Sequence, residues 1–376
     1  MQNPGVRIMK ELYFTIVCAA WLTCCLAARA LDNPVSEETL SPAQYEQSAQ
    51  ASSPVDSHAG RKPETSGKAE AGSQRPLTPA RKRIGLALGG GGSRGAAHVG
   101  VLKVLNEENI PIDMIAGTSI GSVVGGFYAA GKPIDEIAEI FLKNKFTKEF
   151  TPMPALRLAT EPAELMLRLV GYKPYDGLYY GWKFRKFVSK QLDNKQIEEL
   201  SIPYAAVVTD VVTGKSSRLT SGDIALAMQA STAVPGLKKP VQIGDKLYCD
   251  GGLINNVPVN HVREMGADFV IAVDIDEKLK DQPLDKFKGL GSMARQALRI
   301  QLATLDELSD EKADLYIHPD TTGINLVSFK KEDGAHGIQA GEAAARKAIP
   351  EIKKKLELLG ISLKEPGSFS SASTPQ

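Results

Sequence analysis

Short apolar runs alternate with segments of helical periodicity from residue 84 onward. Residues 84–88 form an apolar run that ends in glycines, which predicts a buried strand. Residues 96–109 carry apolar positions at helical spacing and are followed by Pro111, so they predict a helix. Residues 112–117 predict a second buried strand, and residues 119–131 a second helix. Strands and helices that alternate over short links favour an α/β fold with a parallel sheet covered by helices on both faces.

The same alternation continues to about residue 360. Residues 135–200 are mostly helical by pattern, and residues 291–308 predict an amphipathic helix that packs on the domain. The last helix, over 337–360, is predicted to be interrupted at Pro350. The remaining predictions are a strand, a Thr-Gly turn and a returning strand over 203–222, a helix over 223–234 ended by Pro235, a strand, an Asp-Gly-Gly turn and a helix over 246–266, a buried strand over 267–275, and an edge strand over 313–319.

The two ends of the chain lack this pattern. Residues 12–28 are uncharged, follow Arg7 and Lys10, and lead into Ala28-Arg29-Ala30, so residues 1–30 predict a signal peptide for export to a bacterial periplasm or cell envelope. An uncleaved membrane anchor and a lipid anchor on Cys24 or Cys25 are the alternatives. Residues 31–80, rich in Ser, Pro and Ala, predict a disordered linker, and residues 364–376 a disordered tail. One domain over 81–363 remains.

Composition narrows the possible functions only a little. With 43% hydrophobic and 24% charged residues the chain suits a globular protein, and a net charge of +1 gives no sign of a nucleic-acid partner. Three of the four cysteines lie in the export segment, so the mature chain retains Cys249 alone and forms no internal disulfide. Neither a zinc cluster nor another cofactor is expected.

The first chemical feature is the glycine run from Gly89 to Gly92. A glycine backbone adopts positive φ readily and can point successive N–H groups at one spot, and the start of the next helix adds its own donors. Such a loop suits a phosphate or the oxyanion of an acyl transfer. Residues 90–95 also match G-x-G-x-x-G, so a nucleotide site is an alternative, and a simple tight turn is another.

The second and third features are Ser119 and Asp250. Ser119 lies between Gly117 and Gly121, at the turn from a predicted strand into a predicted helix, which is the spacing of a nucleophile elbow. Asp250 ends a predicted strand and precedes Gly251 and Gly252. It is either a base for Ser119 or, as is commoner for this pair, part of an ordinary Asp-Gly turn.

Taken together and in this order, these three features resemble the patatin-like phospholipase family, in particular its bacterial members related to the catalytic domain of neuropathy target esterase. The resemblance runs from about residue 84 to residue 275, with weaker support to about residue 359, and residues 225–241 are similar to the stretch before the family's acidic residue. It implies a three-layer α/β/α fold and makes residues 81–363 the catalytic domain.

The resemblance also implies a mechanism. Ser119 would be the nucleophile and Asp250 the general base of a Ser-Asp dyad that works through an acyl-enzyme. The oxyanion loop maps onto Gly90, Gly91 and Gly92, with Arg94 beside them. The motif glycines are Gly95, Gly117, Gly121, Gly251 and Gly252. No metal takes part.

From the residues alone, a role for a histidine stays open. His261 follows Asp250 in the chain order of a hydrolase triad, but it lies only eleven residues later in a predicted helix and is interpreted as solvated. His98 is one turn beyond Arg94 and is expected to support the site rather than react. The dyad of the family needs no histidine.

The sequence therefore predicts an exported serine hydrolase that cleaves acyl esters of phospholipids or lysophospholipids. Residues 146–182 combine bulky apolar groups with Lys and Arg and are predicted to face a membrane surface; a helical pair that completes the core is the alternative. Two other functions remain as alternatives: a general carboxylesterase without lipid preference, and a phosphate- or lipid-binding module without turnover.

Overall fold

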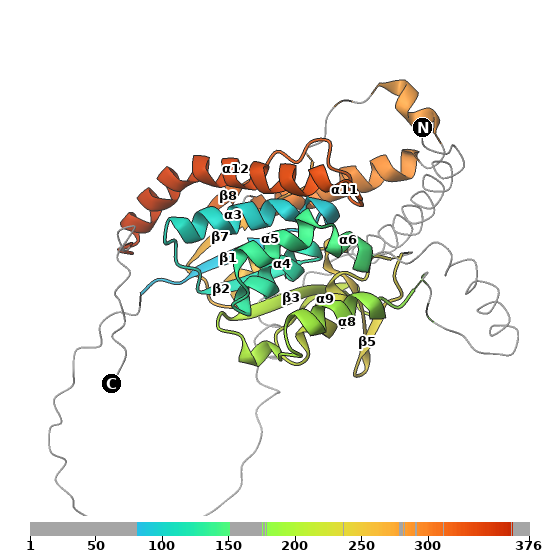
Figure 1. Cartoon of the computed structure of the whole chain (residues 1–376), viewed down its shortest axis with the longest axis horizontal. Coiled ribbons are helices and arrows are strands. Elements are labelled where there is room, and N and C mark those ends of the chain that lie inside the picture. The colour runs from blue at the N-terminus through green and yellow to red at the C-terminus, as the bar shows by residue number, and fades with distance from the viewer. Residues whose placement is uncertain are drawn as a thin grey trace, which may run out of the picture. The chain divides into compact units, whose positions relative to one another are not determined.

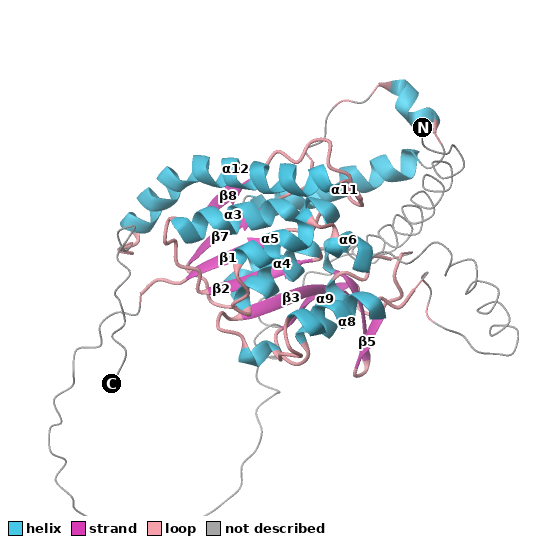
Figure 2. Ribbon diagram, in the orientation of Figure 1, coloured by secondary structure: helices cyan, strands magenta, loops and turns pink. Residues whose placement is uncertain are grey.

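The computed structural model describes residues 81–150, 175, 177, 179–235, 237–277, 281, 283–289, 292–310, 312–361 and 363. The predicted signal peptide, linker and C-terminal tail, and most of the predicted lipid-facing segment, lie outside these residues. The described part of the chain builds one eight-stranded sheet with helices on both of its faces (Figures 1 and 2). The predicted mostly parallel α/β architecture is confirmed.

The central strands of the sheet run parallel, and antiparallel strands lie beside them at one side. Each strand is hydrogen-bonded to the next in the series β5 (Val241–Ile243), β6 (Lys246–Asp250), β3 (Tyr204–Asp210), β2 (Met114–Thr118), β1 (Ile84–Leu88), β7 (Phe269–Val273) and β8 (Leu315–Ile317), and β4 (Lys215–Leu219) also pairs with β3. Pairs from β3 through β2, β1 and β7 to β8 are parallel, whereas β4 and β6 run antiparallel to β3. The predicted edge strand is confirmed as β8.

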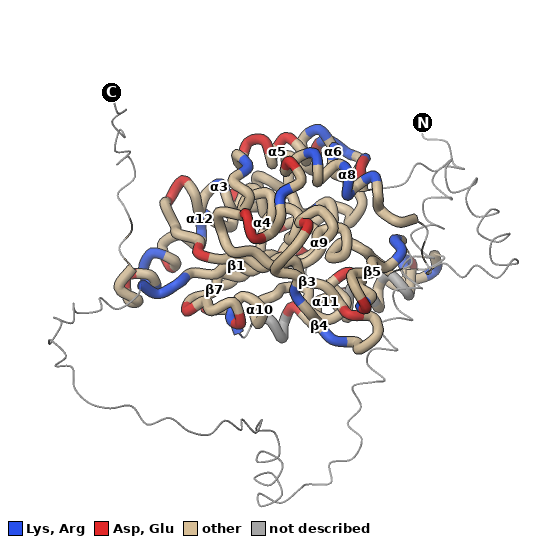
Figure 3. The backbone as a smooth tube through the Cα atoms, turned by 90° about the horizontal axis from the view of Figure 1, so that it is seen from below, with Lys and Arg blue, Asp and Glu red and all other residues tan. Residues whose placement is uncertain are grey.

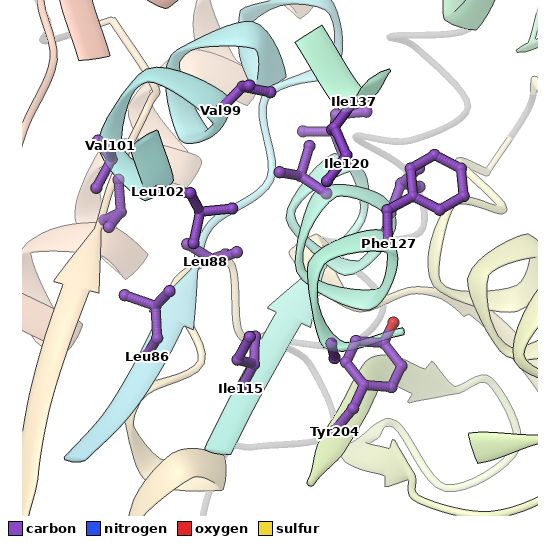
Figure 4. Packing of buried hydrophobic residues seen from close by; sticks show 14 of the residues in the cluster. Leu86, Leu88, Val99, Val101, Leu102, Ile115, Ile120, Phe127, Ile137 and Tyr204 are labelled. Carbon is purple, nitrogen blue, oxygen red and sulfur yellow. The ribbon is translucent and has the colours of Figure 1, made fainter. Parts of the chain in front are cut away.

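Alternate side chains of each central strand enter two separate cores. Leu86 and Leu88 of β1 belong to the larger core together with Ile115, while Ala87 belongs to the smaller one. Figure 4 shows the larger core, where residues of β1 and β2 meet Leu102, Ile120 and other apolar residues of the covering helices. Because both faces are buried, these strands read as continuous apolar runs in the sequence.

The covering helices are divided unequally between the two faces. Val259 and Val262 of α10 (Val259–Glu264) pack in the smaller core, and Figure 3 shows α10 and α11 (Ser292–Asp310) below the sheet. The larger core takes residues from α3 (Ala96–Glu107), α4 (Ile120–Ala129), α5 (Ile134–Leu142), α6 (Lys145–Phe150), α8 (Trp182–Gln191), α9 (Ile224–Ser231) and α12 (Lys331–Leu358). Short 3₁₀ turns complete the fold: η1 (Gly92–Gly95), η2 (Ile197–Glu199), η3 (Gly251–Leu253) and η4 (Leu284–Lys288).

The predicted interruption of the last helix is wrong. α12 runs without a break through Pro350 and begins at Lys331, before the predicted start. It lies alongside α3 (Figure 1), and the two helices approach so closely that a Cβ on Gly341 would lie 2.0 Å from the carbonyl oxygen of Ala97. Ile349 and Ile352, on either side of the proline, are buried. Packing against α3 and the core therefore holds the helix through a residue that removes one backbone hydrogen bond.

The arrangement around β3 decides where the functional residues meet. β2 pairs with the first half of β3 and ends at Thr118, opposite Val207. β6 pairs with the second half of β3 and ends at Asp250, opposite Val208. Since β4 occupies the other edge of β3, β2 and β6 lie end to end along the same edge. The residues that follow β2 and those that end β6 are thus brought together, although about 130 positions separate them in the sequence.

Among the described helices, none is both long enough and apolar enough to cross a membrane.

Candidate active site

Ser119 occupies a strained turn between β2 and α4. Its backbone has φ 52° and ψ −121°, a region that residues other than glycine rarely adopt. Two serines hold this turn: Ser122 donates from Oγ to the carbonyl of Ser119 at 2.6 Å, and the N–H of Ser119 donates to Oγ of Ser231 at 2.9 Å. The side chain of Ser119 is partly exposed. This is the geometry of a nucleophile elbow.

Gly117 and Gly121, on the two sides of Ser119, are required by close backbone contact. A Cβ on Gly117 would lie 2.4 Å from the carbonyl group of Gly121, and a Cβ on Gly121 would lie 2.2 Å from the carbonyl oxygen of Leu88. Any larger residue would force β2, α4 and the end of β1 apart. The G-x-S-x-G pattern is therefore a packing requirement as well as a chemical signal.

Asp250 reaches the same place from the end of β6. Its carboxylate is buried and accepts a hydrogen bond from the N–H of Gly252 at 2.9 Å. Burial raises the pKa of Asp250 from 3.8 to about 6, and this rise is opposed by the bond from Gly252, by a hydrogen bond with the side chain of Ser119 and by the charge of Lys238. The structure thus places the side chain of Ser119 where it lowers the pKa of the Asp250 carboxyl group.

The glycine loop lies directly beside Ser119. A Cβ on Gly90 would be 3.4 Å from Cβ of Ser119. Within the loop the N–H of Gly90 donates to the carbonyl of Asn256 at 3.3 Å. The N–H groups of Gly91 and Gly92 have no acceptor among the described residues, and the positive φ of Gly92, 57°, begins η1. Of the three predicted oxyanion glycines, these two present free donors.

Arg94 lies in η1, directly after the glycine loop. Its backbone N–H donates to the carbonyl of Gly91 at 3.2 Å. Its buried guanidinium pairs with Asp276 at 2.9 Å and Glu277 at 3.3 Å, and Nε donates to the carbonyl of Ile324. All these groups lie after β7 or before α12, so Arg94 ties the loop to the neighbouring part of the sheet edge. The assignment of Arg94 to the oxyanion loop stays a prediction.

His98 supports the glycine loop from behind. Its ring is fully buried, and Nε2 lies 2.8 Å from the carbonyl oxygen of Gly89. Burial lowers the pKa of His98 to about 4, so the ring is neutral and donates from Nε2 to that carbonyl. Nδ1 has no partner within the described residues. The expected supporting role agrees with this position.

His261 is not the solvated residue that the sequence suggested. It is buried, its Nε2 lies 2.8 Å from Oγ of Ser216 on β4, and Nδ1 is near Glu264. Helix α10 is only six residues long, and its position under the sheet turns this ring toward β4. Neither ring nitrogen of His261 is hydrogen-bonded to Ser119 or Asp250. His318 is likewise engaged elsewhere, with Asp274 at 3.0 Å.

Two residues of the site were missed from the sequence. Ser231, at the end of α9, donates to the carbonyl of Val207 at 2.6 Å and accepts from Ser119, so it links β3 to the elbow. Lys238 is buried, with Nζ 3.1 Å from Oγ1 of Thr232 and 3.6 Å from the ring centre of Phe150. Burial lowers the pKa of Lys238 well below its usual value, and Asp250 opposes this shift. The only sequence signal for either residue was its place in the stretch 225–241.

Among the described residues no group of three or more His, Cys, Asp and Glu side chains is arranged to hold a metal ion. The buried acids Asp274 and Asp276 are instead engaged with His318 and Arg94.

Residues 86–263 match the sequence model of a family described as patatin-like phospholipase. This region is therefore a patatin-like phospholipase domain. The matched residues contain the glycine loop, Ser119, Ser231, Lys238 and Asp250, so all parts of the site fall inside the patatin-like region.

Individual proteins are similar to this chain as well. An uncharacterized NTE family protein of Mycobacterium tuberculosis is 36% identical over 194 residues, which are 52% of this chain and 49% of that protein. Lysophospholipase nte1 of Aspergillus fumigatus is 29% identical over 297 residues, which are 73% of this chain and 18% of that protein. The chain thus spans less than half the length of these relatives. A solved structure of human GIVD cytosolic phospholipase A2 with a fluorophosphonate is 12% identical, with a TM-score of 0.42, over 74% of this chain and 59% of that one.

Proposed function

We propose that this patatin-like protein is a serine hydrolase that cleaves acyl ester bonds of phospholipids or lysophospholipids through Ser119 and Asp250. The observations that carry the proposal are the turn at which Ser119 has φ 52° and the buried carboxylate of Asp250, whose pKa the Ser119 side chain lowers. A strained backbone and a buried carboxylate both lower the stability of the fold. Together they present a partly exposed serine beside a base, which is what a nucleophile requires. The Aspergillus relative is named a lysophospholipase, which supports a lipid ester as the substrate.

The first half of the reaction forms an acyl-enzyme. Oγ of Ser119 attacks the ester carbonyl carbon while its proton passes to the carboxylate of Asp250. The N–H groups of Gly91 and Gly92 stabilise the negative charge on the carbonyl oxygen, and each well-aligned donor contributes roughly 3 kcal/mol. When the tetrahedral intermediate collapses, the bond to the alcohol oxygen breaks and Asp250 returns the proton to that oxygen, so that the shortened lipid leaves.

The second half releases the fatty acid. Asp250 takes a proton from a water molecule, whose oxygen attacks the acyl carbon. Collapse of this intermediate breaks the bond to Oγ of Ser119, which recovers the proton. A base is most effective when its pKa lies near the working pH, and burial gives Asp250 a pKa of about 6.

We also place this activity in a bacterial cell envelope, on the strength of the signal peptide that the sequence predicts for residues 1–30.

Labelling with a fluorophosphonate tests the proposal directly, because the probe reacts with activated serines. Wild type should be labelled, whereas Ser119→Ala should not be labelled and Asp250→Asn should be labelled much more slowly. Ser201→Ala is the matched control, since this exposed serine bonds to the carbonyl of Ala129 and should leave labelling intact. If the folded wild type is not labelled even with lipid vesicles present, the hydrolase is refuted. If only short soluble esters are cleaved and lipids are not, a general carboxylesterase replaces the phospholipase.

A further inference from the structure

Helices α6 and α8 form an exposed face that carries almost only positive charge. Residues 142–150 and 179–191, which we call the basic face, contain seven Lys and Arg residues and a single acid, Glu149. The whole chain, by contrast, has a net charge of only +1. Figure 3 shows these Lys and Arg residues gathered over α6 and α8. The charge is therefore concentrated at one place on the molecule.

Within the residues that the structure describes, much of this charge has no counter-ion. Lys143, Lys183 and Arg185 are paired, with Glu139, Glu149 and Asp223 respectively. In the described part of the chain, no carboxylate lies within ion-pair distance of the other four basic residues, all of which are exposed: Lys145, Lys148, Lys186 and Lys190. Four unpaired like charges on two adjacent helices repel one another, so a binding partner with negative charge would relieve the repulsion.

An aromatic pair, of which Trp182 is exposed and Tyr180 half-buried, lies at the start of α8 within the same face. Trp182 is 69% exposed and stacks on Tyr180, with ring centres 4.8 Å apart and planes at 13°. Leu142, at the end of α5, is exposed as well. Trp and Tyr rings among lysines are the composition that proteins place at the boundary between water and lipid headgroups.

The inner side of the basic face covers the site. Phe146 and Phe150 of α6 pack against Phe184 of α8, with ring centres 6.0 and 5.8 Å apart. The rings of Phe150 and Phe184 lie 3.6 and 4.5 Å from Nζ of Lys238, whose charge acts on Asp250. The basic face is thus the outer surface of the layer that covers this end of the site.

We infer that the basic face docks this protein on an anionic lipid bilayer, with Trp182 in the headgroup region and the four unpaired lysines against the lipid phosphates. The inference deepens the proposed function, because it says how a hydrolase of lipids would reach its substrate. Each lysine near an anionic surface strengthens binding by about fivefold, so removal of four should weaken it by a hundredfold or more.

The experiment uses the depth of Trp182 in the lipid. The chain has two tryptophans, Trp21 and Trp182, so a full-length Trp21→Phe protein reports on Trp182 alone. Vesicles of phosphatidylcholine, with or without phosphatidylglycerol, carry bromine atoms on their acyl chains, which quench tryptophan that enters the bilayer. We expect quenching on the anionic vesicles and little on the neutral ones.

Two sets of substitutions make the result specific. Replacement of the four unpaired lysines of the basic face by Gln should abolish the quenching while fluorophosphonate labelling of Ser119 persists. The matched control replaces four exposed lysines elsewhere and should retain the quenching: Lys312, Lys331, Lys347 and Lys354. Circular dichroism confirms that each variant is folded.

Three outcomes would overturn the inference. Protein that sediments with vesicles while Trp182 stays unquenched is held by another segment. Equal quenching on neutral vesicles would show that charge plays no part. An oligonucleotide that displaces the anionic vesicles at stoichiometric concentration would assign the face to nucleic acid. Because labelling of Ser119 is measured separately, a failure of docking is distinguishable from a failure of the hydrolase.

Discussion

Replacing Asp250 by Asn should remove activity and at the same time stabilise the fold. In the unfolded chain this carboxyl group loses its proton near its ordinary pKa of 3.8, whereas burial raises the pKa in the folded protein to about 6. The folded state therefore holds the charge less favourably by roughly two pKa units, or about 3 kcal/mol at 1.4 kcal/mol per unit. Asn keeps an oxygen for the N–H of Gly252 and carries no charge.

The sign of the effect depends on pH. Above pH 6 both states of the wild type are ionised and the full cost of the buried charge is present. As the pH falls from 6 toward 3.8 the folded protein takes up the proton first, so the cost shrinks, and below 3.8 it is gone. The Asn variant should therefore be more stable by about 3 kcal/mol at pH 7.5 and equal to the wild type near pH 4.

Urea denaturation at both pH values measures this difference. Asp210→Asn is a suitable control, because Asp210 is also buried but accepts two backbone N–H groups, from Val212 at 3.0 Å and Thr213 at 3.4 Å. Its replacement weakens two hydrogen bonds and should give no gain in stability. A variant of Asp250 that is less stable than the wild type at pH 7.5 would refute the reasoning. A gain of the same size at pH 4 and pH 7.5 would refute it as well, since a gain from removing charge must vanish when the wild type is protonated.

Three further predictions concern the rest of the site. The wild-type kcat/KM should fall about tenfold from pH 7 to pH 5, because Asp250 protonates near pH 6. Lys238→Met should move the midpoint of the measured pH profile upward, because the charge of Lys238 lowers the pKa of Asp250. Ser231→Ala should lower kcat about tenfold or more with little change in KM, since the N–H of Ser119 loses its acceptor. Steady-state kinetics on a soluble ester measure this, and an unchanged kcat would contradict it. Gly121→Ala should destabilise the protein by about 3 kcal/mol, because its Cβ would lie 2.2 Å from the carbonyl oxygen of Leu88; an unaltered melting temperature would contradict this.

The hydrophobic pattern was sufficient to predict the fold class, because most helices and strands have a clear local sequence pattern. β1 and β2 are short apolar runs followed by glycines, and the helices after them show clear periodicity. The pattern failed where tertiary packing overrides local preference. α12 continues through Pro350 because its glycines and apolar residues pack on α3 and the core. His261 is buried because a six-residue helix gives too few positions to indicate which side faces the sheet.

The site was predicted less completely, and the reason is again physical. Asp250 followed by two glycines has the pattern of an ordinary turn, and only the family resemblance linked it to Ser119. What joins them is the shared edge of β3, a long-range property that no local spacing encodes. Lys238 stands beside another lysine between two prolines, which reads as a solvated turn. Its burial depends on Phe150 and Phe184, which come from other segments.

That shared edge also fixes an order of events during synthesis. A nascent chain exposes Ser119 long before residue 250 has been made, and the serine gains its carboxylate neighbour only when β6 docks beside the end of β2. Contacts across so long a stretch of chain form late in folding, because the loop between them must first be ordered. A truncated molecule would therefore carry Ser119 without its carboxylate neighbour, and the proposed catalytic centre would arise only in a chain that has completed its fold.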